Sequence, residues 1–240
     1  MKKRRLVLVI MVIIFWVICG FYTAVVLNKN RIQNKTIAAY GDSITFGQYS
    51  TDRNKSQGGW PRELATQTEA TVMNEGISGT LAGSVPGFSQ NEDALCNRVD
   101  RNDFKNLDYL TIAYGTNDWE GGLPIGNDQA NKGTFKGALI YSINTIHAKN
   151  TRVKIVLLTP IANAMDGQKN ANGNVFQDFV GAVQEVGKRE HVPVIDLYHD
   201  AGITAKNAPE MFWDKQVHPT DSTYHKLGDL VAEKMEQLNK

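Results

Sequence analysis

The chain has 240 residues, of which 42% are hydrophobic and 21% are charged, and its net charge is +1. This composition is typical of a folded globular protein and excludes a disordered, collagen-like or coiled-coil chain. Basic residues do not cluster beyond positions 2–5. A nucleic-acid-binding surface, which needs grouped Lys and Arg, is therefore not expected.

The N-terminal part of the chain predicts a membrane anchor. Residues 6–27 are uncharged and almost wholly apolar. As a helix they would be about 33 Å long, which is enough to cross a bilayer core of roughly 30 Å. The basic residues before them should stay in the cytoplasm. We therefore expect a cytoplasmic head at 1–5, a transmembrane signal anchor at 6–27, a tether at 28–35 and an extracellular domain at 36–240.

A cleaved signal peptide is the alternative for this segment, and it would make the protein secreted. Such peptides have a shorter apolar core, about 7–15 residues, followed by a small-x-small cleavage site. Residues 22–26 offer no good site of that kind, so the anchor is favoured. The two cysteines are Cys19, inside the apolar segment, and Cys96. A disulfide between them is not expected.

The rest of the chain alternates short apolar strands with helical stretches. We expect strands at 36–40, 71–74, 109–114, 153–159 and 192–196, and helices at 60–68, 91–101, 131–149, 175–189 and 220–238. Such alternation predicts parallel strands joined by right-handed crossovers, with helices on both faces. The fold class is therefore α/β, a three-layer α/β/α sandwich around a flavodoxin-like five-stranded parallel sheet. In such folds ligands bind at the carboxyl ends of the strands.

Four polar clusters lie at this predicted edge, at 41–45, 74–79, 115–118 and 214–219. They contain the parts needed for nucleophilic catalysis. A serine hydroxyl is a weak nucleophile that needs a base within hydrogen-bond reach, and Ser43 and His218 are the candidates. Asp214 is the nearest acid that could orient the imidazole. The amide of Ser43, the amide of Gly76 and the side chain of Asn117 could stabilise the oxyanion that forms on an ester carbonyl.

These clusters resemble the blocks of the SGNH hydrolase (GDSL-like lipase/acylhydrolase) superfamily. Gly41-Asp42-Ser43-Ile44-Thr45 is similar to its first block, and Gly76 to the glycine of the second. Gly115-Thr116-Asn117-Asp118 is similar to the third block, and His218-Pro219 to the last. The resemblance implies Ser43 as nucleophile, His218 as base, Asn117 as oxyanion donor and no cofactor. It covers nearly all of the outer domain.

The acid departs from the family pattern, which places an aspartate three residues before the histidine. Here position 215 is a lysine, and Asp214 precedes His218 by four residues. If this segment forms a helical turn, positions i and i+4 still share a face. Asp214 is therefore our candidate. The alternative is a surface aspartate beside a Ser-His dyad.

The remaining features of the sequence are weaker evidence for a function. The remaining histidines have no ligand spacing, so no metal site is expected. Trp119 and Trp213 flank two of the blocks and could line an acyl or sugar pocket or simply pack in the core. Nucleotide binding lacks support because no glycine-rich phosphate loop follows a strand. A Gly-x-Ser-x-Gly nucleophile elbow is also absent from the sequence.

The sequence thus predicts an extracytoplasmic, membrane-anchored serine esterase that cleaves short-chain or acetyl esters of carbohydrates or lipids through an acyl-serine intermediate. Its expected partners are a small-molecule or glycan ester and the membrane, and no nucleic acid. Two alternatives remain open. One is an O-acyltransferase acting on a cell-wall glycan, and the other is a non-catalytic anchored glycan-binding domain.

Overall fold

The computed structural model describes residues 14 and 16, residues 31–52 and residues 58–238. Its centre is an all-parallel sheet with the strand order β2-β1-β3-β4-β5. The strands are β1 (Thr36–Gly41), β2 (Thr71–Gly76), β3 (Tyr109–Ala113), β4 (Lys154–Leu158) and β5 (Val194–Ile195). The predicted fold class, including the five parallel strands, is confirmed.

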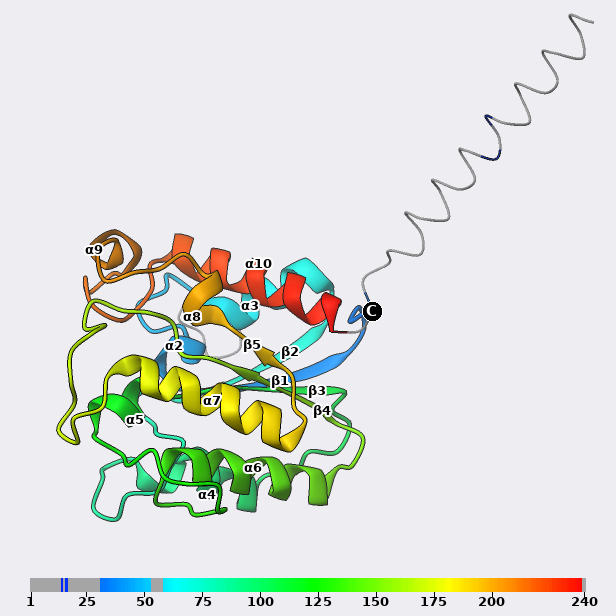
Figure 1. Cartoon of the computed structure of the whole chain (residues 1–240). Helices are drawn as coiled ribbons and strands as arrows, with labels where there is room; N and C mark the ends of the chain where they lie inside the picture. The colour runs from blue at the N-terminus through cyan, green and yellow to red at the C-terminus, as the bar shows by residue number, and fades with distance from the viewer. Residues whose placement is uncertain (1–13, 15, 17–30, 53–57, 239–240) are drawn as a thin grey trace, which may run out of the picture.

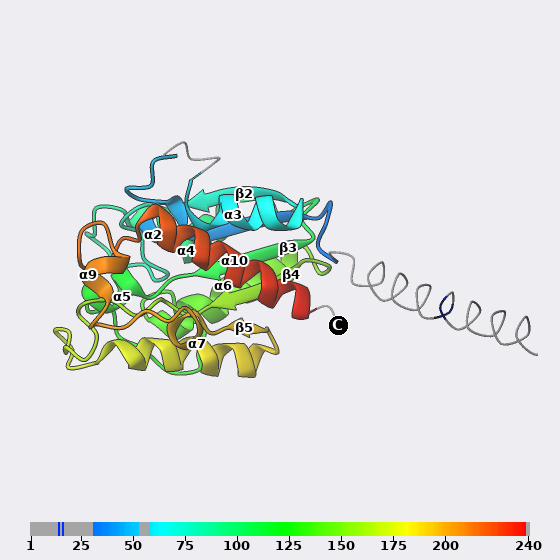
Figure 2. The ribbon, with the colours of Figure 1, turned by 90° about the horizontal axis from the view of Figure 1, so that it is seen from above.

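Helices cover both faces of this sheet (Figure 1). The longer ones are α3 (Gly59–Thr68), α4 (Leu95–Arg101), α6 (Phe135–Lys149), α7 (Phe176–Glu190) and α10 (Asp221–Gln237). Shorter segments are α2 (Ser43–Phe46), η1 (Asn91–Asp93), α5 (Thr116–Glu120), α8 (Leu197–Asp200) and α9 (Ala208–Met211). In Figure 2, α3 and α10 lie side by side over one face.

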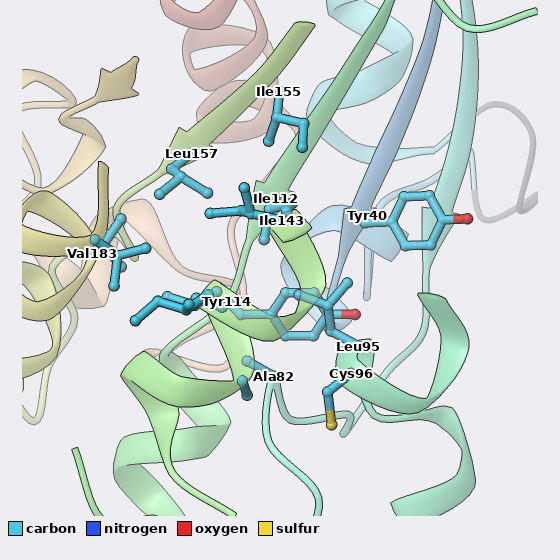
Figure 3. Packing of buried hydrophobic residues seen from close by; sticks show 14 of the residues in the cluster. Tyr40, Ala82, Leu95, Cys96, Ile112, Tyr114, Ile143, Ile155, Leu157 and Val183 are labelled. Carbon is cyan, nitrogen blue, oxygen red and sulfur yellow. The ribbon is translucent and has the colours of Figure 1, made fainter. Parts of the chain in front are cut away.

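Alternate side chains of each strand feed two separate cores, because successive residues of a strand point to opposite faces. Ala38 and Tyr40 of β1 pack with α4, α6 and α7, whereas Ile37 and Ala39 pack with α3 and α10. Figure 3 shows the first of these clusters, in which Ile112 and Leu157 of the sheet lie near Ile143 of α6. Burial on both faces explains why the strands are apolar throughout.

Two predicted helices begin or break differently from expectation. The helix expected at 91–101 is divided at Ala94, whose ψ of 143° is extended, into η1 and α4. The helix expected from position 131 begins at Phe135 instead. Asn131–Thr134 form a turn in which the Thr134 amide donates to the Asn131 carbonyl at 3.2 Å.

The predicted head at 1–5 lies outside the described residues, as does the segment 6–27 apart from positions 14 and 16. Among the residues that the structure describes, no helix is both long enough and apolar enough to cross a bilayer. The described segment 31–52 begins at Arg31, beside the amino ends of the strands and the C-terminal end of α10. The amides of Arg31 and Ile32 donate to the Glu236 carboxylate of that helix at 2.7 and 3.1 Å.

Candidate active site

The candidate nucleophile lies in the sharp turn between β1 and α2. Ser43 is the first residue of α2, and Asp42 caps the helix by accepting the Ile44 amide at 2.9 Å. The turn is tight, since a Cβ on Gly41 would lie 2.0 Å from the Thr45 hydroxyl oxygen and 2.8 Å from the Ala113 carbonyl oxygen. The geometry holds the Ser43 side chain at the carboxyl edge of the sheet.

Ser43, His218 and Asp214 form one hydrogen-bonded chain. The Ser43 Oγ lies 2.9 Å from Nε2 of His218, and Nδ1 of His218 lies 2.5 Å from Oδ2 of Asp214. The histidine and aspartate side chains are about one quarter exposed, so solvent and a substrate can reach them. The contact between Ser43 and His218 joins residues that are 175 positions apart in the chain.

The Asp214 contact does not use the helical turn that the sequence suggested. Lys215 adopts a left-handed conformation, with a φ of 67°, and breaks any helix there. Oδ1 of Asp214 instead accepts the amides of Gln216, Val217 and His218 at 2.8–3.1 Å, which leaves Oδ2 for the imidazole. The loop thus accommodates one residue more than the family pattern has, and the contact between Asp214 and His218 is kept.

The same contacts set the charge of this acid. Burial by itself would raise the pKa of Asp214, but the hydrogen bonds from the Val217 and Gln216 amides and from the imidazole keep that pKa below its ordinary value. Asp214 is therefore an anion at neutral pH. An anion at this position favours the Nδ1–H tautomer of His218, in which Nε2 is free to accept the serine proton.

The amide of Gly76, which we predict as an oxyanion donor, already has an acceptor in this structure. It donates to Oδ1 of Asn74 at 3.0 Å. The glycine is required for packing instead, because a Cβ there would lie 2.2 Å from the Phe46 nitrogen of α2. Asn74 Nδ2 also donates to the carbonyls of Thr45 and Gly58 at 2.8 and 3.0 Å. Asn74, to which the sequence analysis assigns no role, thus ties β2 to the nucleophile turn.

Asn117 lies on α5, which follows β3 at the same sheet edge. Its Nδ2 donates one hydrogen to the Thr80 carbonyl at 2.9 Å, and the second hydrogen remains for another acceptor. Within the described residues the neighbouring amide of Gly79, which has a φ of 78°, donates no hydrogen bond. We take the Gly79 amide, in place of that of Gly76, as the second candidate donor beside the Ser43 amide.

Two carboxyl groups are buried behind the site. Burial raises the pKa of Asp42 to about 6, against the opposing effects of the Ile44 amide and the nearby His218. Burial raises the pKa of Asp118 to about 7, against the hydrogen bonds from the Gly83 and Ala82 amides. Oδ1 of Asp118 accepts those two amides and so ties the loop at 82–83 to α5.

The two tryptophans flanking the blocks have different surroundings. Trp119 is 4% exposed, packs edge-on against Phe176 and donates its indole N–H to the Asn174 carbonyl, so it belongs to the core. Trp213 is 55% exposed and lies next to Asp214 in the chain. In the described part of the chain, no three His, Cys, Asp or Glu residues form a group that could hold a metal ion.

Comparison with known proteins places this geometry among hydrolases. Residues 39–226 match the model of the GDSL-like lipase/acylhydrolase family. Comparison with curated proteins gave no match.

Solved structures with the same fold include a Lactobacillus plantarum protein with 22% identity and a TM-score of 0.69, covering 87% of this chain and 97% of that one. The aryl esterase of M. smegmatis has 22% identity and a TM-score of 0.61, covering 85% and 99%. A carbohydrate acetylesterase family member from Sinorhizobium meliloti has 16% identity and a TM-score of 0.60, covering 85% and 98%. At these identities the likeness establishes a shared fold.

Proposed function

The chain belongs to the GDSL-like lipase/acylhydrolase family and is an ester-cleaving hydrolase, and on this premise we propose a serine esterase that works through an acyl-Ser43 intermediate. The observation that carries the proposal is the continuous hydrogen-bonded chain from Asp214 through His218 to the Ser43 hydroxyl. The roles of the individual residues follow from that order.

The reaction begins when Oγ of Ser43 attacks the ester carbonyl while Nε2 of His218 takes the hydroxyl proton. The carbonyl oxygen becomes an oxyanion, for which the Ser43 amide, the Gly79 amide and Asn117 Nδ2 are the proposed donors. The Ser43 amide is the first of α2 and has no acceptor within that helix. Collapse of the intermediate breaks the bond to the alcohol oxygen, which receives the proton from His218.

Deacylation repeats these steps with water. His218 takes a proton from the water molecule, the hydroxide attacks the acyl carbonyl, and the bond to Oγ breaks as the proton returns to Ser43. The products are the carboxylic acid and the alcohol, and the enzyme is regenerated. Asp214 stays an anion throughout and stabilises the imidazolium that forms twice in the cycle.

We propose a short acyl group, acetyl above all. A structural neighbour named as a carbohydrate acetylesterase family member makes an acetylated carbohydrate the first substrate to try.

A fluorophosphonate probe tests the nucleophile directly, because it phosphonylates an activated serine hydroxyl and releases fluoride. We expect one adduct, on the peptide that carries Ser43, and its loss in a His218→Ala variant. An adduct on another serine would contradict the assignment. Hydrolysis of p-nitrophenyl esters from acetate to palmitate tests the acyl preference, and a maximum at the long chains would contradict a short acyl group.

We also propose that residues 6–27 anchor the enzyme with its site facing outward. Arg31 lies beside the amino ends of the strands, whereas Ser43 lies at their carboxyl ends, so an anchor that precedes Arg31 in the chain would leave the site facing away from the membrane (Figure 1). Proteinase K added to intact cells should degrade the domain. Protection until the cells are lysed would contradict the orientation, and release into the medium would contradict the anchor.

A further inference from the structure

Two aromatic rings form a stacked pair beside the candidate base. The rings of Tyr49 and Trp213 lie 4.2 Å apart at an interplanar angle of 15°. The Tyr49 ring also meets the His218 ring edge-on, with 5.3 Å between centroids and an angle of 83°. Tyr49 is half-buried between these neighbours, whereas Trp213 is 55% exposed. The indole therefore has one face covered by tyrosine and offers the other to solvent.

Both rings are fixed to the segments that carry the reacting groups. The Trp213 amide donates to the His218 carbonyl at 2.8 Å. Tyr49 follows α2 directly, and its φ of 63° is uncommon for a residue with a side chain. Its neighbour Gln48 is held on both sides, since its amide donates to the Ser43 carbonyl and its carbonyl accepts the Tyr224 hydroxyl at 2.9 Å. Unusual backbone kept beside a site is typical of a functional constraint.

The position of the pair decides which part of an ester it can touch. His218 must deliver its proton to the oxygen of the departing alcohol, so that alcohol lies on the His218 side of Ser43. The carbonyl oxygen is bound by the proposed oxyanion donors and not by His218. A platform in contact with the His218 ring therefore faces the alcohol portion of the substrate and not its acyl chain.

We propose that the Tyr49–Trp213 pair binds the alcohol portion of the ester and that this portion is a sugar ring. The inference rests on the proposed esterase function and adds the residues that bind the sugar. A flat, open indole face suits the C–H face of a pyranose, whose hydroxyl groups stay hydrated at the rim. An alkyl chain would gain less, because its binding depends on removing apolar surface from water and a half-exposed surface buries only one side of the chain.

The test compares two acetate esters in the full-length enzyme and its Trp213→Ala variant. Acetylated methyl xyloside and ethyl acetate give the same acetyl-enzyme, so they differ only in the alcohol that leaves. We expect the variant to lose about 10-fold in kcat/KM on the acetylated sugar, the scale of one aromatic contact. The rate on ethyl acetate should change less than about 2-fold, which also shows that the variant is folded.

Two further variants serve as controls. Trp213→Phe keeps a flat ring and should retain most of the activity on the sugar ester. Met73→Ala removes a side chain that is 40% exposed on the edge strand β2, and it should alter neither rate.

The outcomes separate this inference from the function on which it rests. Equal loss on both esters would mean that the pair only supports His218, and that result overturns the proposal. So does an unchanged rate on the sugar ester. If the wild-type enzyme hydrolyses neither ester, the proposed esterase function fails and the sugar platform fails with it.

Discussion

Replacing Asp118 by Asn should make the stability of the protein less dependent on pH. Oδ1 of this fully buried side chain accepts the Ala82 and Gly83 amides at 2.9 and 3.3 Å. Oδ2 is buried and has no hydrogen-bond partner within the described residues. Burial raises the pKa from 3.8 to about 7, since the desolvated anion is disfavoured.

The sign of the effect follows from this raised pKa. Between about pH 4 and pH 7 the folded state keeps the Asp118 proton that the unfolded chain has released, so stability falls as the pH rises. Above pH 7 the loss is complete. A shift of about 3 units corresponds to about 4 kcal/mol. Asparagine cannot ionise and keeps the Oδ1 contacts, but its amide group lacks a partner where Oδ2 lies, which costs about 1–3 kcal/mol.

Urea unfolding followed by tryptophan fluorescence at pH 4.5 and pH 8 measures this difference. At pH 8 the variant should be about 1–3 kcal/mol more stable than the wild type. This difference is the free-energy cost of burying the Asp118 anion minus the cost of the unpaired asparagine amide. At pH 4.5, where about 1 kcal/mol of the wild-type loss has already occurred, it should be less stable by up to about 2 kcal/mol. Asp229→Asn, at an exposed position of α10, is the matched control and should show no such crossover. A variant effect that is identical at both pH values would refute a titrating Asp118.

Three other substitutions test the site. Asn117→Ala removes one proposed oxyanion donor and should lower kcat by about 10²–10³, and an unchanged kcat would remove Asn117 from the site. Asp214→Ala should lower kcat by about 10⁴, whereas a Ser-His dyad that does without the acid would lose little. Gly76→Ala puts a Cβ 2.2 Å from the Phe46 nitrogen and should destabilise the fold by about 3 kcal/mol in urea unfolding. A neutral Gly76→Ala would argue against the close approach of β2 and α2.

The sheet could be predicted because its strands are buried on both faces and therefore apolar throughout. The shorter segments could not, because α2, α5, α8 and α9 have only four or five residues each and show no helical period. The nucleophile and base were found through motifs that follow strands. Their contact across 175 positions required the parallel order of the strands, which the alternating pattern does predict.

The sequence alone does not predict which side chains contact one another at the site. The choice between Gly76 and Gly79 as amide donor depends on Asn74, whose Oδ1 takes the Gly76 amide. The route from Asp214 to His218 depends on the left-handed Lys215, an uncommon conformation that its residue type does not signal. No pattern in the sequence indicates a role for Tyr49, because its stacking on Trp213 joins two loops that are distant in the chain.

The most direct test of the account compares p-nitrophenyl acetate hydrolysis by the full-length enzyme and its Ser43→Ala variant. The Ser43 hydroxyl lies 2.9 Å from Nε2 of His218, and in the proposed mechanism its oxygen forms the bond to the acyl carbon. The variant should therefore lose about 10⁴-fold or more in kcat and retain its fold by circular dichroism. Hydrolysis by the variant at a rate close to that of the wild type would contradict a serine esterase acting through Ser43.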